Sequence, residues 1–192
     1  DIAVDHVLTR SVRDAALTMA ALQGNGADGL AEAVPRLTGP VGAHFRIGVI
    51  TVAADGIRPD QEVAAGIERT RRLLASLGHR VIDVEWPFSA ADFARDFVSL
   101  WSLGAAEALV GVNKAFGADG VAQLEPLTRH LADQGRSLAE ADVRALMARL
   151  AGYRDAYNAS FREHDLLLTP VLSRHAVKVG ELSPTRPPAE VM

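Results

Sequence analysis

Phe45-Arg46-Ile47-Gly48-Val49-Ile50-Thr51-Val52 is the stretch that decides the fold. It is rich in apolar and β-branched residues and is too short for a typical helix, so it predicts a buried strand over residues 45–52. A second strand is predicted over 80–86, where apolar and charged residues alternate before a proline. Between them, Asp60 begins a helical repeat that ends at Gly78. A strand, a helix and a strand of these lengths predict a right-handed crossover in a parallel sheet, and therefore an α/β fold.

Helical patterns precede and follow this unit. Ser11 and Asp14 stand in a capping relation and predict a helix over about 12–23, with one face buried along a stripe of Val12, Ala15, Ala16, Met19 and Leu22. A long apolar helix is predicted over about 90–115 and a shorter one over 125–134.

The last third of the chain predicts one more long helix and a third strand. Ser137 and Glu140 repeat the capping signature at the start of a helix that extends through Arg162, with apolar residues on its inner side. A compact apolar run at 166–169, stopped by Pro170, predicts a third buried strand. With no internal repeat and no evident linker, residues 1–192 are expected to form a single domain.

Composition excludes several classes of function. The 192 residues are 48% hydrophobic and carry a net charge of −4, with no basic patch of the kind that nucleic-acid binding requires. No apolar run approaches the roughly 20 residues needed to span a bilayer. The chain has no cysteine, which removes disulfides and thiolate sites within it. We therefore expect a cytoplasmic protein with neither nucleic-acid nor membrane partners.

Isolated motifs do not form a catalytic site. The glycines at 24–29 match a dinucleotide fingerprint letter by letter, but a helix precedes them where that fingerprint needs a strand, which favours a flexible turn. The six histidines show no metal-binding spacing, so no metal is expected. His164 with Asp165 fits either a base with its orienting acid or, more commonly, favourable charge at a helix end. Lys114 and Lys178 are best explained as solvated side chains.

Three segments resemble the amidase-signature family of serine amidases. Val4-Asp5-His6-Val7-Leu8-Thr9-Arg10-Ser11-Val12-Arg13-Asp14-Ala15-Ala16 is similar to the helix start that follows that family's Gly/Ser-rich signature. The strand at 46–49, with the helix that ends in Leu77-Gly78-His79, follows in the family's order, and 161–170 reads as the family's F-x-x-H-D-L-L-L-T-P run. The first two sub-patterns look like the branch that includes hydrolases of 6-aminohexanoate cyclic dimers.

The resemblance implies part of an α/β/α hydrolase that cleaves carboxylic amides without a cofactor, through a Ser, cis-Ser and Lys triad. The family's triad lies upstream of the position that corresponds to Asp1, so no catalytic residue is expected in this chain. The chain is interpreted as a partial amidase domain that also lacks a later sheet segment and is inactive alone. A non-catalytic α/β binding or interaction domain remains the alternative.

A supporting role in substrate binding follows from the same resemblance. Helices after the second strand would wall the acyl pocket, through Phe97 and Trp101, together with the turn at Thr169 and Pro170, although core packing is the commoner role for such aromatic residues. The expected ligand is a small-molecule amide. Exposed apolar edges of a partial sheet would favour association of copies, with a homodimer as one form.

Overall fold

The computed structural model describes residues 7–22, 39, 42–53 and 56–191, and its contacts divide the chain into units of 1–43 and 44–192. In the first unit, α1 spans Val12–Leu22. The Ser11 hydroxyl accepts the Asp14 N–H at 3.1 Å, so the predicted start is confirmed. The predicted burial of the apolar stripe is not seen in the described residues, because Val12 is 80% exposed and Leu22 is 64% exposed.

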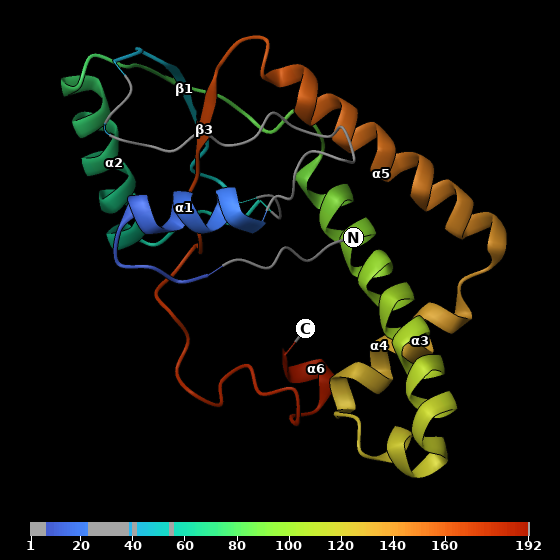
Figure 1. Cartoon of the computed structure of the whole chain (residues 1–192). Helices are drawn as coiled ribbons and strands as arrows, with labels where there is room; N and C mark the ends of the chain where they lie inside the picture. Colours follow the sequence, from blue (N-terminus) through green and yellow to red (C-terminus); the bar gives the residue numbers. More distant parts are fainter. Residues whose placement is uncertain (1–6, 23–38, 40–41, 54–55, 192) are drawn as a thin grey trace. The chain divides into compact units, whose positions relative to one another are not determined.

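The second unit is built on a parallel sheet with the strand order β2-β1-β3, which confirms the predicted α/β class (Figure 1). The strands are β1 at Arg46–Val49, β2 at Arg80–Asp83 and β3 at Leu166–Leu168. Ile47 is paired with Val81 on one side and with Leu166 on the other. The central position of β1 explains why Ile47 and Val49 are almost completely buried.

All three strands begin within a residue of the prediction but are shorter than the predicted 45–52, 80–86 and 166–169. The ladder ends where Ile50 donates its N–H to the Leu168 carbonyl at 3.0 Å and Val84 donates to Val49 at 3.0 Å. Residues 51–52 and 85–86 follow these bonds outside the ladder and line space at the sheet edge.

Helix α2, at Gln61–Ser76, connects β1 to β2 and contacts β2. Asp60 caps it by accepting the Val63 N–H at 2.9 Å. The chain leaves the helix through Gly78, whose φ of 89° lies in the left-handed region that glycine favours. The predicted start and stop of this helix are therefore confirmed.

The helices that follow differ from prediction at their ends. Helix α3 spans Ala90–Ala122, but the backbone at Gly117 is not helical, with φ 67° and ψ −164°, so the span consists of two helices joined at a kink. The first of them ends close to the predicted 115. Helix α4 spans Pro126–Ser137 and α5 spans Glu140–Ser160. The predicted capping role of Ser137 is wrong, since its hydroxyl donates to the Gln134 carbonyl within the last turn of α4.

A small core joins α3 to α4, where Ala105 and Leu109 pack against Leu131 and Ala132. Further along, α5 contacts α3 and leads back to the sheet at β3, and the short helix α6 at Pro188–Val191 contacts α4 (Figure 1). No helix in the described part of the chain is long and apolar enough to cross a bilayer. The sheet and the α3–α5 pair together position the candidate site.

Candidate functional site

The carboxyl ends of β1 and β2 border a hollow at one edge of the sheet, which is where open parallel sheets commonly bind ligands. This strand-end hollow has a volume of about 480 Å³ and is lined by residues 49–52 and 83–86. The Trp86 indole N–H donates to the Val52 carbonyl at 2.8 Å. This bond connects the two strand ends and fixes the orientation of the indole.

An aromatic hollow of about 320 Å³ adjoins the strand-end hollow at Trp86, which lines both spaces. Its walls are almost entirely apolar. The Phe88 ring centre lies 5.7 Å from that of Trp86, 5.1 Å from that of Phe93 and 5.3 Å from that of Tyr153. Such separations are typical of interacting aromatic rings, so the cluster forms a continuous wall from the sheet edge to α5.

A buried carboxylate holds this wall in place. Asp96 on α3 is 2% exposed and accepts two hydrogen bonds from the Arg149 guanidinium, both at 2.8 Å. It also accepts the Tyr153 hydroxyl at 2.8 Å. Arg149 is the main cause of the lowered pKa of Asp96, and the bond to Asp96 raises the pKa of Tyr153. The network ties α3 to α5 and fixes the position of the Tyr153 ring.

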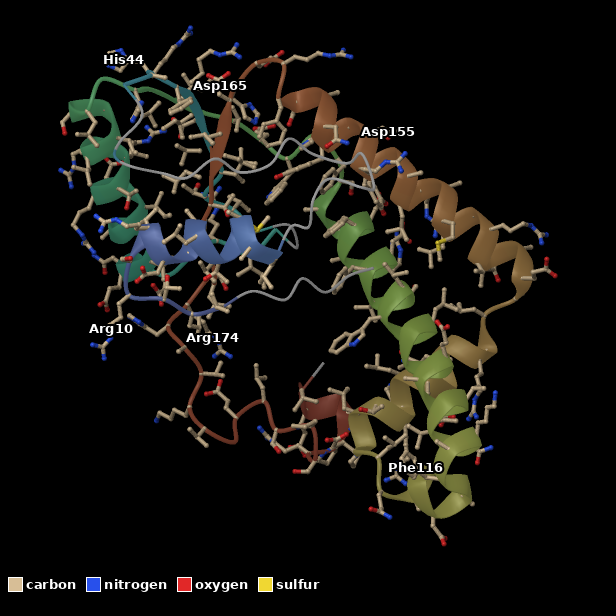
Figure 2. The ribbon with its side chains drawn as sticks, viewed as in Figure 1. Arg10, His44, Phe116, Asp155, Asp165 and Arg174 are labelled. Carbon is tan, nitrogen blue, oxygen red and sulfur yellow. The ribbon has the colours of Figure 1, made fainter. Side chains whose placement is uncertain are left out.

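A third hollow, of about 600 Å³, lies between α2 and the segment after β3. Thr169 and Pro170 line it, and Arg174 and His175 stand on the same wall. The His175 imidazole lies 2.8 Å from the Glu62 carboxylate, and this contact raises the pKa of His175. Figure 2 shows Arg174 in the segment that follows β3.

The structure places the predicted pocket residues at two separate positions. Phe97 and Trp101 lie on α3 and are 38% and 42% exposed. The Phe97 ring lies 6.1 Å from that of Phe93, at the edge of the aromatic cluster. Thr169 and Pro170 line the hollow beside α2 instead.

Sequence reasoning missed the residues that do line the aromatic hollow. Trp86 and Phe88 flank a proline directly after a predicted strand, which was a usable signal, because strand ends in parallel sheets border ligand sites. Tyr153 lies within the predicted helix that ends at Arg162, and only the tertiary contact with Asp96 shows where its hydroxyl is held.

The suggested pair of His164 and Asp165 does not form a base with its orienting acid. The Asp165 carboxylate accepts the Arg46 guanidinium and the Arg46 N–H, each at 2.8 Å, and these bonds lower the pKa of Asp165 to about 2. Neither ring nitrogen of His164 has a hydrogen-bond partner in the described part of the chain. Asp165 lies where β3 begins, as labelled in Figure 2.

The remaining motifs give no further candidate site among the described residues. Lys114 and Lys178 are exposed, in agreement with their interpretation as solvated side chains. Among the described residues, no group of histidine and carboxylate side chains could hold a metal ion. The glycine motif at 24–29 lies outside the described residues.

Comparison with known proteins gives a consistent result. A family model described as Amidase matches residues 1–192. The chain is 32% identical over 187 residues to a Mycobacterium tuberculosis (strain H37Rv) protein named "Putative amidase AmiC", and 31% identical over 191 residues to the Mycobacterium leprae protein of the same name. Each match covers 96% of this chain, which spans 39% of the length of these relatives.

Two solved structures with a similar fold are of 6-aminohexanoate cyclic dimer hydrolase, one of them complexed with substrate. Each superimposes with a TM-score of 0.70 at 22% sequence identity. The match covers 91% of this chain and 38% of the hydrolase. The two chains therefore share the arrangement of strands and helices described above.

Proposed function

The chain belongs to the amidase family, and on that premise we propose that it forms part of an enzyme that hydrolyses carboxylic amide bonds. The family match over all 192 residues is the observation that carries this proposal. The strand-end hollow supports it, since it lies where an α/β enzyme commonly binds its substrate.

The proposed mechanism uses a Ser, cis-Ser and Lys triad. The serine attacks the amide carbonyl, the second serine relays the proton, the lysine acts as the base, and backbone N–H groups stabilise the oxyanion. We assign none of these roles to a residue of this chain. Its role is to supply part of the scaffold and part of the pocket wall, so we expect the 192 residues alone to hydrolyse no amide.

We assign the apolar part of the substrate to the aromatic hollow, because Trp86 connects this hollow to the strand ends and its walls are almost free of polar atoms. Phe97 extends the same wall through Phe93. Trp101, Thr169 and Pro170 are proposed as further contacts of a long substrate. An apolar wall selects substrates by size and shape, so amides with an extended alkyl or aryl group are the expected class. The named substrate of the hydrolase with the similar fold, a 6-aminohexanoate cyclic dimer, is one such amide to test.

The test is an amide-hydrolysis assay on the complete protein with linear and cyclic aliphatic amides, combined with labelling by a serine-reactive phosphonate. Hydrolysis together with labelling of one serine supports the proposal. No hydrolysis and no labelling would leave a non-catalytic α/β binding domain as the function. The 192-residue chain serves as the negative control.

Phe97→Ala tests the pocket wall, and Phe116→Ala on the same helix is the matched control. Phe97 touches the aromatic cluster, whereas Phe116 is 73% exposed near the far end of α3, as labelled in Figure 2. Phe97→Ala should raise the KM for alkyl amides by about fivefold, in line with the loss of part of an apolar contact. An equal effect of both substitutions would contradict the assignment.

A further inference from the structure

The hollow between α2 and the segment after β3 has the features of a binding site for an organic anion. It has a volume of about 600 Å³, and its lining includes the apolar side chains of Val63, Ile67 and Leu172 and the polar side chains of Arg69 and Thr169. We call it the α2 hollow. We propose that it binds a carboxylate that carries a short alkyl chain, with the Arg69 guanidinium as the anchor of the carboxylate group.

The two walls of the α2 hollow are joined at the start of α2. The Asp60 N–H donates to the Ser173 carbonyl at 2.8 Å. Two residues further along each wall, His175 Nε2 lies 2.8 Å from the Glu62 carboxylate. These contacts hold the segment after β3 against α2, so the hollow is already formed before a ligand enters. A preformed site favours binding, because little ordering of the protein is needed.

Arg69 has unused hydrogen-bonding capacity at this site. A guanidinium carries five N–H donors, and no hydrogen bond or ion pair joins that of Arg69 to another described residue. A Cβ at Gly66 would lie 3.7 Å from Arg69 Nη2, so the guanidinium lies beside a part of α2 that has no side chain. The half-buried Thr169 also has a hydroxyl without a hydrogen-bond partner in the described part of the chain.

The charges around the hollow favour an anion. No aspartate or glutamate is among its described lining residues. Arg174 of the lining is paired with Glu181 at 2.9 Å, and His175 is in contact with Glu62. Both of these cationic groups therefore have a carboxylate partner, whereas the charge of Arg69 has none among the described residues. An unpaired positive charge attracts an anion and repels a cation.

A carboxylate fits Arg69 by shape as well as by charge. Its two oxygens can accept two parallel N–H bonds from the planar guanidinium. Val63 and Ile67 lie one turn apart on α2, and Leu172 belongs to the other wall, so apolar surface is available on both sides for the alkyl chain. The proposal goes beyond amide hydrolysis, since it concerns the binding of an anion and no step of the reaction.

The experiment is a titration of the complete protein with sodium pentanoate, followed by saturation-transfer NMR, with pentanol and inorganic phosphate as comparison ligands. Arg69→Gln removes the anchor and should weaken pentanoate binding by about tenfold. Arg72→Gln is the matched control, because Arg72 lies on the same helix outside the lining and the net charge changes equally. It should change the affinity by less than about twofold.

A second pair of variants tests the space instead of the charge. Gly66→Leu fills part of the hollow without removing a charged group and should weaken pentanoate binding by about tenfold or more. Gly111→Leu is its control at an exposed position of α3, where a Cβ would meet nothing within 4 Å, and should leave the binding unchanged. Both substitutions replace glycine within a helix by a better helix former, so neither should lower the melting temperature.

A carboxylate is also a product of amide hydrolysis, so the variants, and not binding alone, locate the site. The proposal is supported if Arg69→Gln weakens pentanoate binding more than Arg72→Gln does and leaves pentanol binding unchanged. It is overturned if pentanoate does not bind, if the two arginine variants have the same effect, or if Gly66→Leu leaves the binding unchanged. Tighter binding of phosphate than of pentanoate would overturn the assignment to a carboxylate. None of these outcomes alters the hydrolysis assay, so the two proposals fail independently.

Discussion

Replacing Gly135 with alanine should push α3 and α4 apart. Gly135 is buried in the last turns of α4 and faces the backbone of α3. An added Cβ would lie 2.1 Å from the Ser102 carbonyl oxygen and 3.0 Å from the Leu103 nitrogen, whereas an ordinary van der Waals contact is 3.4–4 Å. These are backbone atoms, which cannot rotate away as a side chain can. The helices would therefore have to separate by roughly 1 Å, and such overpacking destabilises a core.

Two effects of opposite sign decide the magnitude of Gly135→Ala. Alanine in place of glycine stabilises a helix by up to about 1 kcal/mol. Forcing a methyl group into a filled space costs about 1–3 kcal/mol, and separation of the helices would also loosen the packing of Leu131 and Ala132, which are 2% and 0% exposed. The clash should dominate, so we expect a loss of about 2 kcal/mol in the free energy of unfolding.

The assay is urea unfolding of the complete protein, followed by circular dichroism. Gly152→Ala is the matched control, since Gly152 lies in α5 and a Cβ there would meet nothing within 4 Å. This substitution should stabilise the protein by about 0.5–1 kcal/mol. If Gly135→Ala proves as stable as the wild type, the close approach of α3 and α4 is refuted.

Three further substitutions test the sheet and the helix pair. Asp165→Asn weakens the pairing with Arg46, and because the pKa of Asp165 is lowered to about 2, the contribution of this pair to folding stability is full above about pH 4 and is lost as the pH falls toward 2. The melting temperatures of variant and wild type should therefore converge near pH 2, and a difference that persists there would contradict this. Asp96→Ala removes the buried acceptor, and its partner Arg149 is half exposed and can reach water, so urea titration should show a loss of about 2 kcal/mol in the free energy of unfolding. A change below about 0.5 kcal/mol would show that this network does not hold α3 and α5 together. Gly48→Ala places a Cβ 2.8–3.3 Å from side chains that can move, so a loss of about 1 kcal/mol is expected, smaller than for the backbone clash in α4; a larger loss would reverse this ranking.

The sequence located the strands but could not determine their lengths. An apolar run shows that a segment is buried, and β1 at Arg46–Val49 lies inside the predicted 45–52. Where a strand ends depends on where its neighbour stops offering hydrogen bonds, and here the last bonds are made by Ile50 and Val84. The residues that accept these bonds are distant in sequence from the donors. The apolar residues that follow Ile50 and Val84 were therefore included in the predicted strands, although they line the edge of the sheet.

Helix ends were predictable where one signal acted alone. Asp60 and Gly78 define α2 as expected, because no competing cap lies near them. Ser137 fits both the end of α4 and the start of α5 by its spacing, and only the hydrogen bond from its hydroxyl to the Gln134 carbonyl shows that it acts within α4. The break at Gly117 lies two residues beyond the predicted end at 115, but the second helical stretch that follows it within α3 was not predicted.

The candidate site was only partly accessible from sequence because its parts come from distant segments. Asp96 is separated by more than 50 residues from both Arg149 and Tyr153, and a carboxylate in an apolar helix gives no indication of such partners. The buried state of His164 likewise depends on the absence of a side chain at Gly48, on another strand. The family resemblance pointed to α3 as a pocket wall; Phe97 lies beside Phe93 of the aromatic cluster, and its contact with a substrate stays a prediction.

Two internal hydrogen bonds have a consequence for selectivity under the proposed function. The Trp86 indole is held by the Val52 carbonyl and the Tyr153 hydroxyl is held by Asp96, so the polar atoms of both rings are already paired. What they present to the aromatic hollow is ring surface, which attracts apolar groups and offers a ligand no unpaired donor from these two residues. Discrimination at this wall therefore depends on the size and shape of the apolar group. Under the proposed function, recognition of the amide itself falls to groups beyond this wall, in keeping with the proposal that the catalytic triad lies outside this chain.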